Sequence, residues 1–161
     1  MPRESPENDQ TEASDESRGA HYFDDDPTVP SDPLVIDVTL ADTAFALETD
    51  RCVFSRGHID TGTSMLLRAM LPLSSTGNLL DLGCGAGPIA LTMARRSPDA
   101  TVWAIDVNSR ARSVCERNAL RNSLTNVKVV RPADIPDGLR FESIWSNPPI
   151  RIGKAAMHEL L

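Results

Sequence analysis

The sequence is poor in aromatic residues, which make up 4% of it, and it contains only three cysteines, Cys52, Cys84 and Cys115. An odd number at wide spacing fits neither a disulfide framework nor a zinc site, so we expect no metal and a reducing, cytoplasmic compartment. Uninterrupted apolar runs of roughly eighteen residues are absent, which argues against a membrane span. The first residues also lack the apolar core of a signal peptide, so we expect no export.

Negative charge is unevenly distributed along the chain. The net charge is −7, but residues 1–33 alone hold ten acidic and two basic side chains. The other 128 residues hold 14 basic and 13 acidic side chains and are nearly neutral. A segment so charged and so poor in large apolar groups cannot bury enough surface to offset its ordering entropy. We therefore predict a disordered acidic tail over residues 1–33.

The remaining sequence alternates between strand and helix patterns. A β-hairpin is predicted within residues 34–50, and residues 51–161 are assigned to the main domain. We expect a helix capped by Asp60, Thr61 or Thr63. Strands are expected over 78–82, 101–105, 126–130 and 141–145, and helices over 88–96 and from about 109. Such alternation predicts parallel βαβ units. The expected fold class is α/β, with a Rossmann-like, doubly wound, mostly parallel sheet and an N-terminal β-hairpin.

The most informative stretch is Asp81-Leu-Gly-Cys-Gly-Ala-Gly-Pro88, where the first parallel strand meets its helix. Gly83, Gly85 and Gly87 permit a tight turn and let a ligand lie against bare backbone. Asp106 ends the next strand, 19 positions after Gly87, where an acidic residue commonly hydrogen-bonds ribose hydroxyl groups. The combination predicts a site for a nucleoside cofactor.

Two nucleoside cofactors compete for this loop. The spacing of Gly85, Gly87 and Ala90 formally satisfies the dinucleotide fingerprint, so NAD is one candidate. The charge of Asp81 would repel a pyrophosphate, however, and Pro88 lacks the N–H that an anion would use at the start of the helix. S-adenosyl-L-methionine has no phosphate and carries two cationic groups that suit a nearby carboxylate. The electrostatics favour S-adenosyl-L-methionine.

Asn147-Pro148-Pro149-Ile150 follows the fourth expected parallel strand as a stiff loop. The Asn147 side-chain oxygen and the Pro148 carbonyl can both accept hydrogen bonds from one planar amine. The N–H groups of an amine become more acidic as its nitrogen attacks an electrophile, so such acceptors would bind more tightly in the transition state. The loop therefore predicts methyl transfer to a planar amine.

These motifs resemble those of class I S-adenosylmethionine-dependent methyltransferases that act on planar amino groups. The stretch from Val53 to Leu67 is similar to the segment before the glycine loop in the methyltransferase small-domain family, which includes ribosomal RNA guanine-N2 methyltransferases. The resemblance covers about residues 34–161. It implies an N-methyltransferase that acts on an exocyclic amine, foremost guanine N2, with ribosomal RNA or a ribosomal subunit as its partner.

The resemblance also implies roles for individual residues. Gly83, Gly85 and Gly87 would lie at the methionine part of the cofactor, Asp106 at the ribose, and Ala133 or Asp134 at the adenine. Phe54, Asp60, Gly62 and Thr63 would close over the methionine end, and Asp81 and Val107 are also assigned to cofactor binding. Asn147 and Pro148 would grip the acceptor amine, and Pro149 and Ile150 complete the catalytic set. The stretch 54–63 is equally compatible with a capped helix and a core phenylalanine.

Two features depart from the family pattern. The residue after Asn-Pro-Pro is often aromatic, whereas here Ile150 provides no ring to stack on a base. The family fold has further strands, whereas this sequence ends within an expected helix at 153–161. We therefore expect a truncated or divergent chain in which the fourth parallel strand forms an exposed, mostly apolar edge.

Several alternatives remain open at this stage. The acceptor could be a glutamine side-chain amide of a translation release factor, or the chain could be a non-catalytic S-adenosylmethionine-binding module, or an NAD-dependent oxidoreductase. The arginines of the two later helices either form a basic face for RNA or are simply solvated: Arg95, Arg96, Arg110, Arg112, Arg117 and Arg121. The sequence indicates no oligomeric state.

Overall fold

The computed structural model describes residues 30–51, 53 and 57–148. Its elements are β1 (Leu34–Leu40), β2 (Thr43–Thr49), α2 (Thr61–Ala69), β3 (Asn78–Leu82), α3 (Pro88–Arg96), β4 (Thr101–Ile105), α4 (Ser109–Arg121), β5 (Val127–Val130), the 3-10 helix η1 (Pro132–Asp134) and β6 (Ser143–Trp145). Nearly all of the predicted acidic tail and the expected helix at 153–161 lie outside the described residues. Within the described part, no helix is long and apolar enough to span a bilayer.

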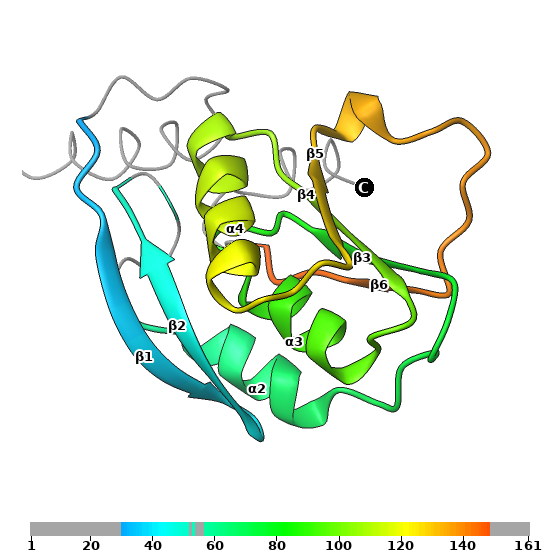
Figure 1. Ribbon diagram of the computed structural model, residues 1–161, viewed down its shortest axis with the longest axis horizontal. Coiled ribbons are helices and arrows are strands. Elements are labelled where there is room, and N and C mark those ends of the chain that lie inside the picture. Colours follow the sequence, from blue (N-terminus) through cyan, green and yellow to red (C-terminus); the bar gives the residue numbers. More distant parts are fainter. Residues whose placement is uncertain (1–29, 52, 54–56, 149–161) are drawn as a thin grey trace, which may run out of the picture.

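Two sheets organise the described residues. Strands β3 to β6 form a four-stranded sheet in the order β5-β4-β3-β6, and every neighbouring pair in it is parallel. Strands β1 and β2 form an antiparallel hairpin in which Leu40 pairs with Thr43. Helices α2, α3 and α4 lie between this hairpin and the parallel sheet (Figure 1). The α/β prediction, with its parallel sheet and N-terminal hairpin, is confirmed.

Each helix begins at a residue suited to that position. The Asp60 side chain accepts a hydrogen bond from the Thr63 N–H and caps α2, and the Asn108 side chain caps α4 by accepting from the N–H groups of Arg110 and Ala111. Helix α3 begins at Pro88, directly after Gly87, whose φ of 91° is left-handed. Proline fits the first helical turn because no intrahelical partner is needed there. These starts place the first residues of all three helices close to the site described below.

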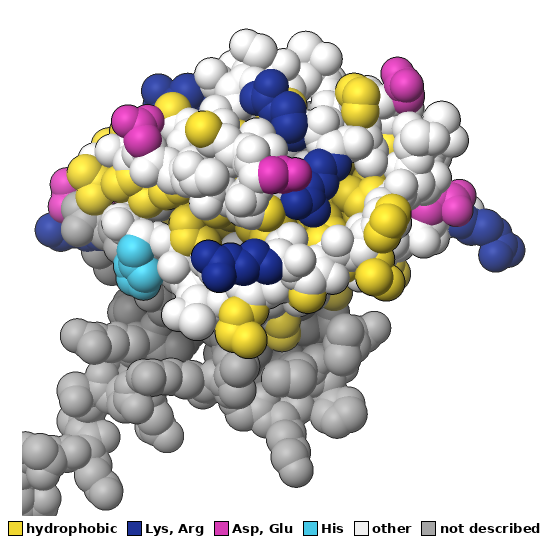
Figure 2. Space-filling model, turned by 90° about the horizontal axis from the view of Figure 1, so that it is seen from below, with side chains coloured by type: hydrophobic (Ala, Val, Ile, Leu, Met, Phe, Trp, Pro, Cys, Tyr) yellow, Lys and Arg dark blue, Asp and Glu magenta, His cyan; other side chains and the backbone are white. Residues whose placement is uncertain are grey.

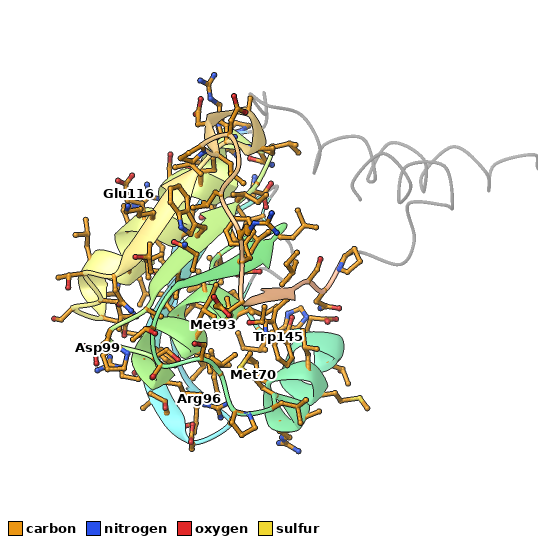
Figure 3. All side chains as sticks on the ribbon, turned by 90° about the vertical axis from the view of Figure 1, so that its right-hand side faces the viewer. Met70, Met93, Arg96, Asp99, Glu116 and Trp145 are labelled. Carbon is orange, nitrogen blue, oxygen red and sulfur yellow. The ribbon has the colours of Figure 1, made fainter. Side chains whose placement is uncertain are left out.

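Apolar packing joins the helices to the sheet. Leu79 of β3, Val102 of β4 and Leu91 of α3 have no exposed surface in one continuous core. Met93 belongs to the same core, and Met70 and Trp145 pack against it (Figure 3). This contact fixes β6 against the helical layer although β6 is only three residues long.

A single asparagine anchors the hairpin to α4. Asn118, which has no exposed surface, accepts a hydrogen bond from the backbone N–H of Glu48 at 2.7 Å and donates to the Glu48 carbonyl at 2.8 Å. Its second amide hydrogen is donated to the carbonyl of Ala86 in the glycine loop at 2.9 Å. The hairpin is thereby tied to both α4 and the glycine loop.

Strand β6 lies at the edge of the sheet. Within the described residues it pairs with β3 alone, and Ile144 is 61% exposed. The strand is shorter than predicted because pairing with β3 begins only at Ser143. The predicted exposed edge is thus observed in the part of the chain that the structure describes.

Candidate active site

A cavity opens at the carboxyl ends of β3, β4 and β6. Parallel strands end at the same edge of a sheet, and open α/β folds bind their ligands there. The lining residues come from β2, the segment between β2 and α2, the start of α2, the end of β3, the glycine loop and the start of α3, the end of β4, the loop before α4 and the start of α4, η1 and the loop after β6. They are Leu47, Thr49, Val53, His58, Ile59, Asp60, Thr63, Leu82, Gly83, Cys84, Gly85, Ala86, Pro88, Ile89, Ile105, Asp106, Val107, Asn108, Ala111, Pro132, Asn147 and Pro148.

The glycine loop is held against the end of β4 by its own backbone. The N–H groups of Gly83 and Cys84 both donate to the carbonyl of Ile105 at 2.9 Å. Gly83 and Gly85 have φ angles of 75° and 54°, and a Cβ at either position would meet no atom within 4 Å. Glycine is therefore favoured by the backbone conformation, and the space beside it is free for a ligand.

Asp106 connects the loop to the start of α4. One carboxylate oxygen accepts from the Gly85 N–H at 2.9 Å, and the other accepts from the Asn108 N–H at 2.9 Å. Burial raises the pKa of Asp106, while these backbone hydrogen bonds and the Arg112 guanidinium act to lower it, and the net shift is upward. Each oxygen keeps a further lone pair, so the carboxylate can also accept from a hydroxyl group in the cavity.

Asp81 lies beneath the loop rather than in the cavity wall. Its Oδ2 accepts from the N–H of Ala90 in the first turn of α3 at 2.9 Å, whereas its buried Oδ1 has no hydrogen-bond partner in the described structure. Burial, together with the charge of Asp106, raises the pKa of Asp81 to about 7. Asp81 lies outside the cavity lining, and its contact with the cofactor stays a prediction. A cation bound nearby would favour the ionised form of this carboxyl group.

Gly87 lies where α3 and α4 approach each other closely. A Cβ on Gly87 would lie 2.6 Å from the Sγ of Cys115 on α4 and 2.9 Å from Leu91. The close approach of α3 to α4 therefore requires glycine here, which is the role of the last glycine in such loops. Gly87 is not part of the cavity lining, and its contact with the cofactor stays a prediction.

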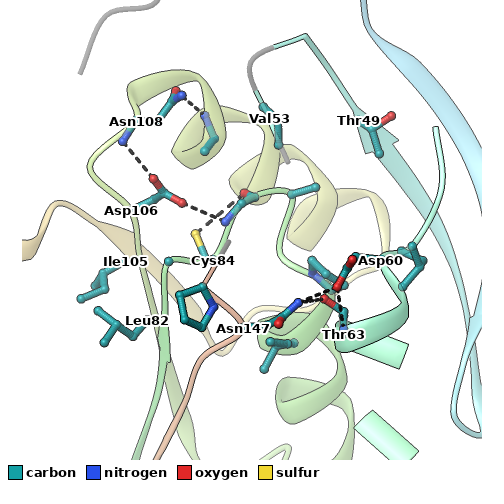
Figure 4. A pocket seen from close by; sticks show the side chains of 18 of the residues that line it. Thr49, Val53, Asp60, Thr63, Leu82, Cys84, Ile105, Asp106, Asn108 and Asn147 are labelled. Carbon is teal, nitrogen blue, oxygen red and sulfur yellow. Dashed lines mark hydrogen bonds between the residues drawn. The ribbon is translucent and has the colours of Figure 1, made fainter. Parts of the chain in front are cut away.

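The loop after β6 forms the opposite wall. Asn147 and Pro148 line the cavity, and the Asn147 Nδ2 donates to Oδ2 of Asp60 at 2.8 Å and to Oγ1 of Thr63 at 2.9 Å. Figure 4 shows Asp106 and Asn108 on one side of the cavity and Asn147, Asp60 and Thr63 on the other. The structure thus places the asparagine motif and the glycine loop around one space.

Some predicted residues lie elsewhere. Ala133 and Asp134 are exposed in η1 and do not line the cavity, because Asp134 is turned toward Arg131, with which it forms a 2.8 Å ion pair. Gly62 also lies outside the lining and instead borders Asp60 and Asn147. Val107 does line the cavity. The predictions for Phe54, Pro149 and Ile150 fall outside the described residues.

Sequence reasoning missed other residues of the cavity wall. Pro132, the residue before Ala133, lines the cavity, and Asn108, Leu47 and Thr49 were not predicted at all. The asparagine two positions after Asp106 and directly before a helix is a capping signal that would have identified Asn108. The hairpin residues carry no comparable local signal because their place depends on tertiary packing.

The arginines predicted as a possible basic face have partners within the protein. Arg117 and Arg121 form ion pairs of 2.6 and 2.8 Å with Glu48, and Arg96 pairs with Asp42; Arg95, Arg110 and Arg112 donate to backbone carbonyls of Asn122, Arg51 and Asp106, respectively. Figure 2 shows basic, acidic and apolar side chains interspersed over the face that it displays. Each of these six arginines therefore has a hydrogen-bond or ion-pair partner within the protein.

Comparison with known proteins agrees with this geometry. Residues 44–161 match the methyltransferase small domain family. The chain is 36% identical over 143 residues to the uncharacterized protein YbxB of Bacillus subtilis, covering 87% of this chain and 71% of that protein. It is 39% identical over 109 residues to ribosomal RNA small subunit methyltransferase C of Shewanella oneidensis, covering 65% of this chain. It spans only 30% of the length of that relative.

A solved structure shares the fold. A Thermus thermophilus 16S ribosomal RNA N2 G1207 methyltransferase, determined with AdoMet and guanosine, superposes with a TM-score of 0.65 at 24% identity, covering 80% of this chain and 36% of that chain. The expected Rossmann-like methyltransferase fold is therefore confirmed. Since the family match covers most of the sequence and the fold agrees with it, the chain belongs to the methyltransferase small domain family of S-adenosylmethionine-dependent methyltransferases.

Proposed function

We propose that this protein transfers a methyl group from S-adenosyl-L-methionine to an exocyclic amine, and that the amine is N2 of a guanine in ribosomal RNA. The observation that carries the proposal is that Asn147, Gly85 and Asp106 line the same cavity. Family membership supports the reaction class, and the ribosomal RNA methyltransferase among the relatives supports the substrate.

The residues present fit this cofactor. Gly83 and Gly85 leave open space beside bare backbone, and Asp106 offers lone pairs to a ribose. A sulfonium cation above the loop would favour the ionised form of buried Asp81, whose pKa is raised to about 7. When bound, the cofactor supplies an electrophilic methyl group on a cationic sulfur. No pyrophosphate is needed, and the two carboxyl groups would oppose one, which disfavours NAD.

The protein's contribution to catalysis is orientation. The Asn147 carbonyl oxygen and the Pro148 carbonyl would hold the amine in the plane from which its nitrogen lone pair reaches the methyl group. Both are acceptors, so they stabilise the amine most when its N–H groups are most acidic, which is in the transition state. Neither is basic enough to remove the proton, which leaves to water once nitrogen has become cationic.

Methyl transfer with a labelled donor tests the proposal. The full chain is incubated with S-adenosylmethionine labelled in its methyl group and, separately, with small ribosomal subunits, protein-free ribosomal RNA and a release factor. The expected product is N2-methylguanosine in RNA digested to nucleosides, with Asn147→Ala reducing its rate of formation by about 100-fold or more.

Each other outcome counts against part of the proposal. Label in a release-factor glutamine would replace the RNA substrate by a protein amide. Cofactor binding by calorimetry without transfer to any acceptor would indicate a binding module. Tighter binding of NADH than of S-adenosylmethionine would refute the reaction class itself.

A further inference from the structure

The amide of Asn147 is oriented by two residues at the start of α2. Asp60 and Thr63 receive its two hydrogens at 2.8 and 2.9 Å. A carboxylate only accepts hydrogen bonds, so the side of the amide that faces Asp60 must be the NH₂ group. The carbonyl oxygen Oδ1 then receives no hydrogen bond from any residue that the structure describes, and it is left to bind another donor.

Asp60 is itself held rigidly. The same Oδ2 that accepts from Asn147 also accepts from the Thr63 N–H at 3.1 Å, as the N-cap of α2. Burial raises the pKa of Asp60, but hydrogen bonds from Asn147 and from the backbone of Thr63 and Gly62 outweigh it and lower the pKa overall. Asp60 is therefore a fixed negative charge at neutral pH. Thr63, the second residue that accepts from Asn147, is held in place by burial, because it is only 5% exposed.

Gly62 is the residue that permits this contact. A Cβ at Gly62 would lie 2.8 Å from Oδ2 of Asp60 and 2.9 Å from Oδ1 of Asn147. Both distances are shorter than a carbon–oxygen contact allows, so any side chain would displace Asn147 or Asp60. The sequence Asp60-Thr-Gly-Thr63 thus fits as a unit against the loop after β6.

We infer that Asp60 and Thr63 are positioning residues for methyl transfer, which fix Asn147 with its Oδ1 presented to the acceptor amine. The inference rests on the proposed function, because it gives Asn147 an amine to bind. It differs from the role implied by the family resemblance, in which Asp60 and Thr63 act directly on the methionine end of the cofactor.

The charge of Asp60 strengthens the effect of orientation. A carboxylate bonded to the NH₂ group polarises the amide and increases the electron density on Oδ1. During transfer the nitrogen lone pair forms a bond to the methyl carbon, and the carbon–sulfur bond breaks with its electron pair going to sulfur. Positive charge develops on nitrogen and its proton leaves to water, so a more electron-rich Oδ1 helps most in the transition state. Loss of the contact should therefore lower kcat and leave KM nearly unchanged.

Three variants test this inference in the full chain. Asp60→Ser keeps an N-cap but is too short to reach Asn147, and Thr63→Val removes only the hydroxyl group. We expect Asp60→Ser to lower kcat by about 10- to 100-fold, with KM for RNA and the Kd for S-adenosylmethionine changed less than about twofold. Asp60→Asn, whose side-chain oxygen can still accept from Asn147 but carries no charge, should recover only the part of the rate that depends on orientation. Thr61→Val, exposed at the start of the same helix, is the matched control for Thr63→Val.

A double mutant separates positioning from a general structural role. In single-turnover reactions, Asp60→Ser should have little further effect on the residual rate of Asn147→Ala, because the contact is already lost. An undiminished effect in that background would overturn the inference. So would an Asp60→Ser defect that falls on the Kd for S-adenosylmethionine, which would assign Asp60 to the cofactor instead.

Side-chain NMR distinguishes a failure of the proposed methyl transfer from a failure of the positioning inference. The NH₂ resonances of Asn147 should shift in Asp60→Ser and Thr63→Val but not in Thr61→Val. If the wild type shows this pattern yet methylates no acceptor, the proposed function fails and the catalytic inference fails with it. If the wild type is active and Asp60→Ser leaves kcat unchanged, only the positioning inference fails.

Discussion

The backbone N–H of Gly85 donates a 2.9 Å hydrogen bond to Oδ2 of Asp106, so the carboxylate at the end of β4 holds the centre of the glycine loop. The same carboxylate faces the cavity. It therefore shapes the loop in the structure, and under the proposed function it would also accept from a ribose hydroxyl group.

Replacing Asp106 should weaken cofactor binding more than folding. Asp106→Ala loses a charged acceptor for both the loop and the ribose, and a hydrogen bond to a charged group contributes about 1.5–3 kcal/mol. We expect the Kd for S-adenosylmethionine, measured by calorimetric titration, to rise by about 10- to 100-fold. Asp134→Ala, which removes an exposed carboxylate on η1, should leave the Kd unchanged. Equal Kd values for Asp106→Ala and the wild type would refute the role of Asp106.

Gly87 and Gly138 offer a matched pair for separating backbone strain from crowding. Both have left-handed φ angles, 91° and 75°, but a Cβ meets Cys115 at 2.6 Å in the first case and no atom within 4 Å in the second. Because alanine is strained at a left-handed φ, substitution by alanine should lower the free energy of unfolding by about 1–2 kcal/mol at either position. At Gly87, crowding of the new Cβ should lower it by about 1–3 kcal/mol more. Urea unfolding measures both values.

A second background tests whether the contact with Cys115 causes the larger loss of stability expected for Gly87→Ala. In a Cys115→Ala background, which removes the sulfur atom, the difference between Gly87→Ala and Gly138→Ala should shrink. A difference that persists undiminished would show that the contact with Cys115 is not its cause.

The pKa of Asp81 predicts how stability depends on pH. Folding raises this pKa from 3.8 to about 7, so between these values the folded state binds more protons than the unfolded state. The free energy of unfolding should therefore fall as pH rises from about 4 to 7, with Asp81 contributing at most about 4 kcal/mol of that decrease. In Asp81→Asn, the free energy of unfolding, measured by urea titration at pH 5 and at pH 8, should decrease less between the two pH values than it does in the wild type. A decrease of the same size in both proteins would contradict the assignment to Asp81.

The glycine loop and the asparagine motif show what local sequence can predict. Helix α3 has the predicted bounds, and α4 starts at the predicted residue, because apolar periodicity and capping residues mark them. Asn147 was predicted at the same rim as Gly85 because parallel strands share an orientation, and both line one cavity. Patterns confined to one element, together with the geometry of parallel sheets, sufficed for these features.

Contacts between distant segments were not predictable in the same way. Asp60 was expected to cap a helix and does so, but its bond to Asn147 joins residues 87 positions apart. Arg117 and Arg121 looked like solvated helix residues, although both pair with the buried carboxylate of Glu48. No periodicity in one segment reports the polar group that another segment brings to it, so such pairs emerge only from the fold.

The amide of Asn118 bears on how small a working fragment can be. Its two hydrogens and its oxygen are hydrogen-bonded to the backbone of Glu48 and Ala86. If β1 and β2 were removed, this buried amide would lose its bonds to Glu48. A shortened form that starts at β3 would therefore leave polar groups of Asn118 without hydrogen-bond partners. The minimal autonomous unit for engineering or isotope labelling therefore begins at the hairpin, although the residues expected to handle the methyl donor come almost entirely from later in the chain.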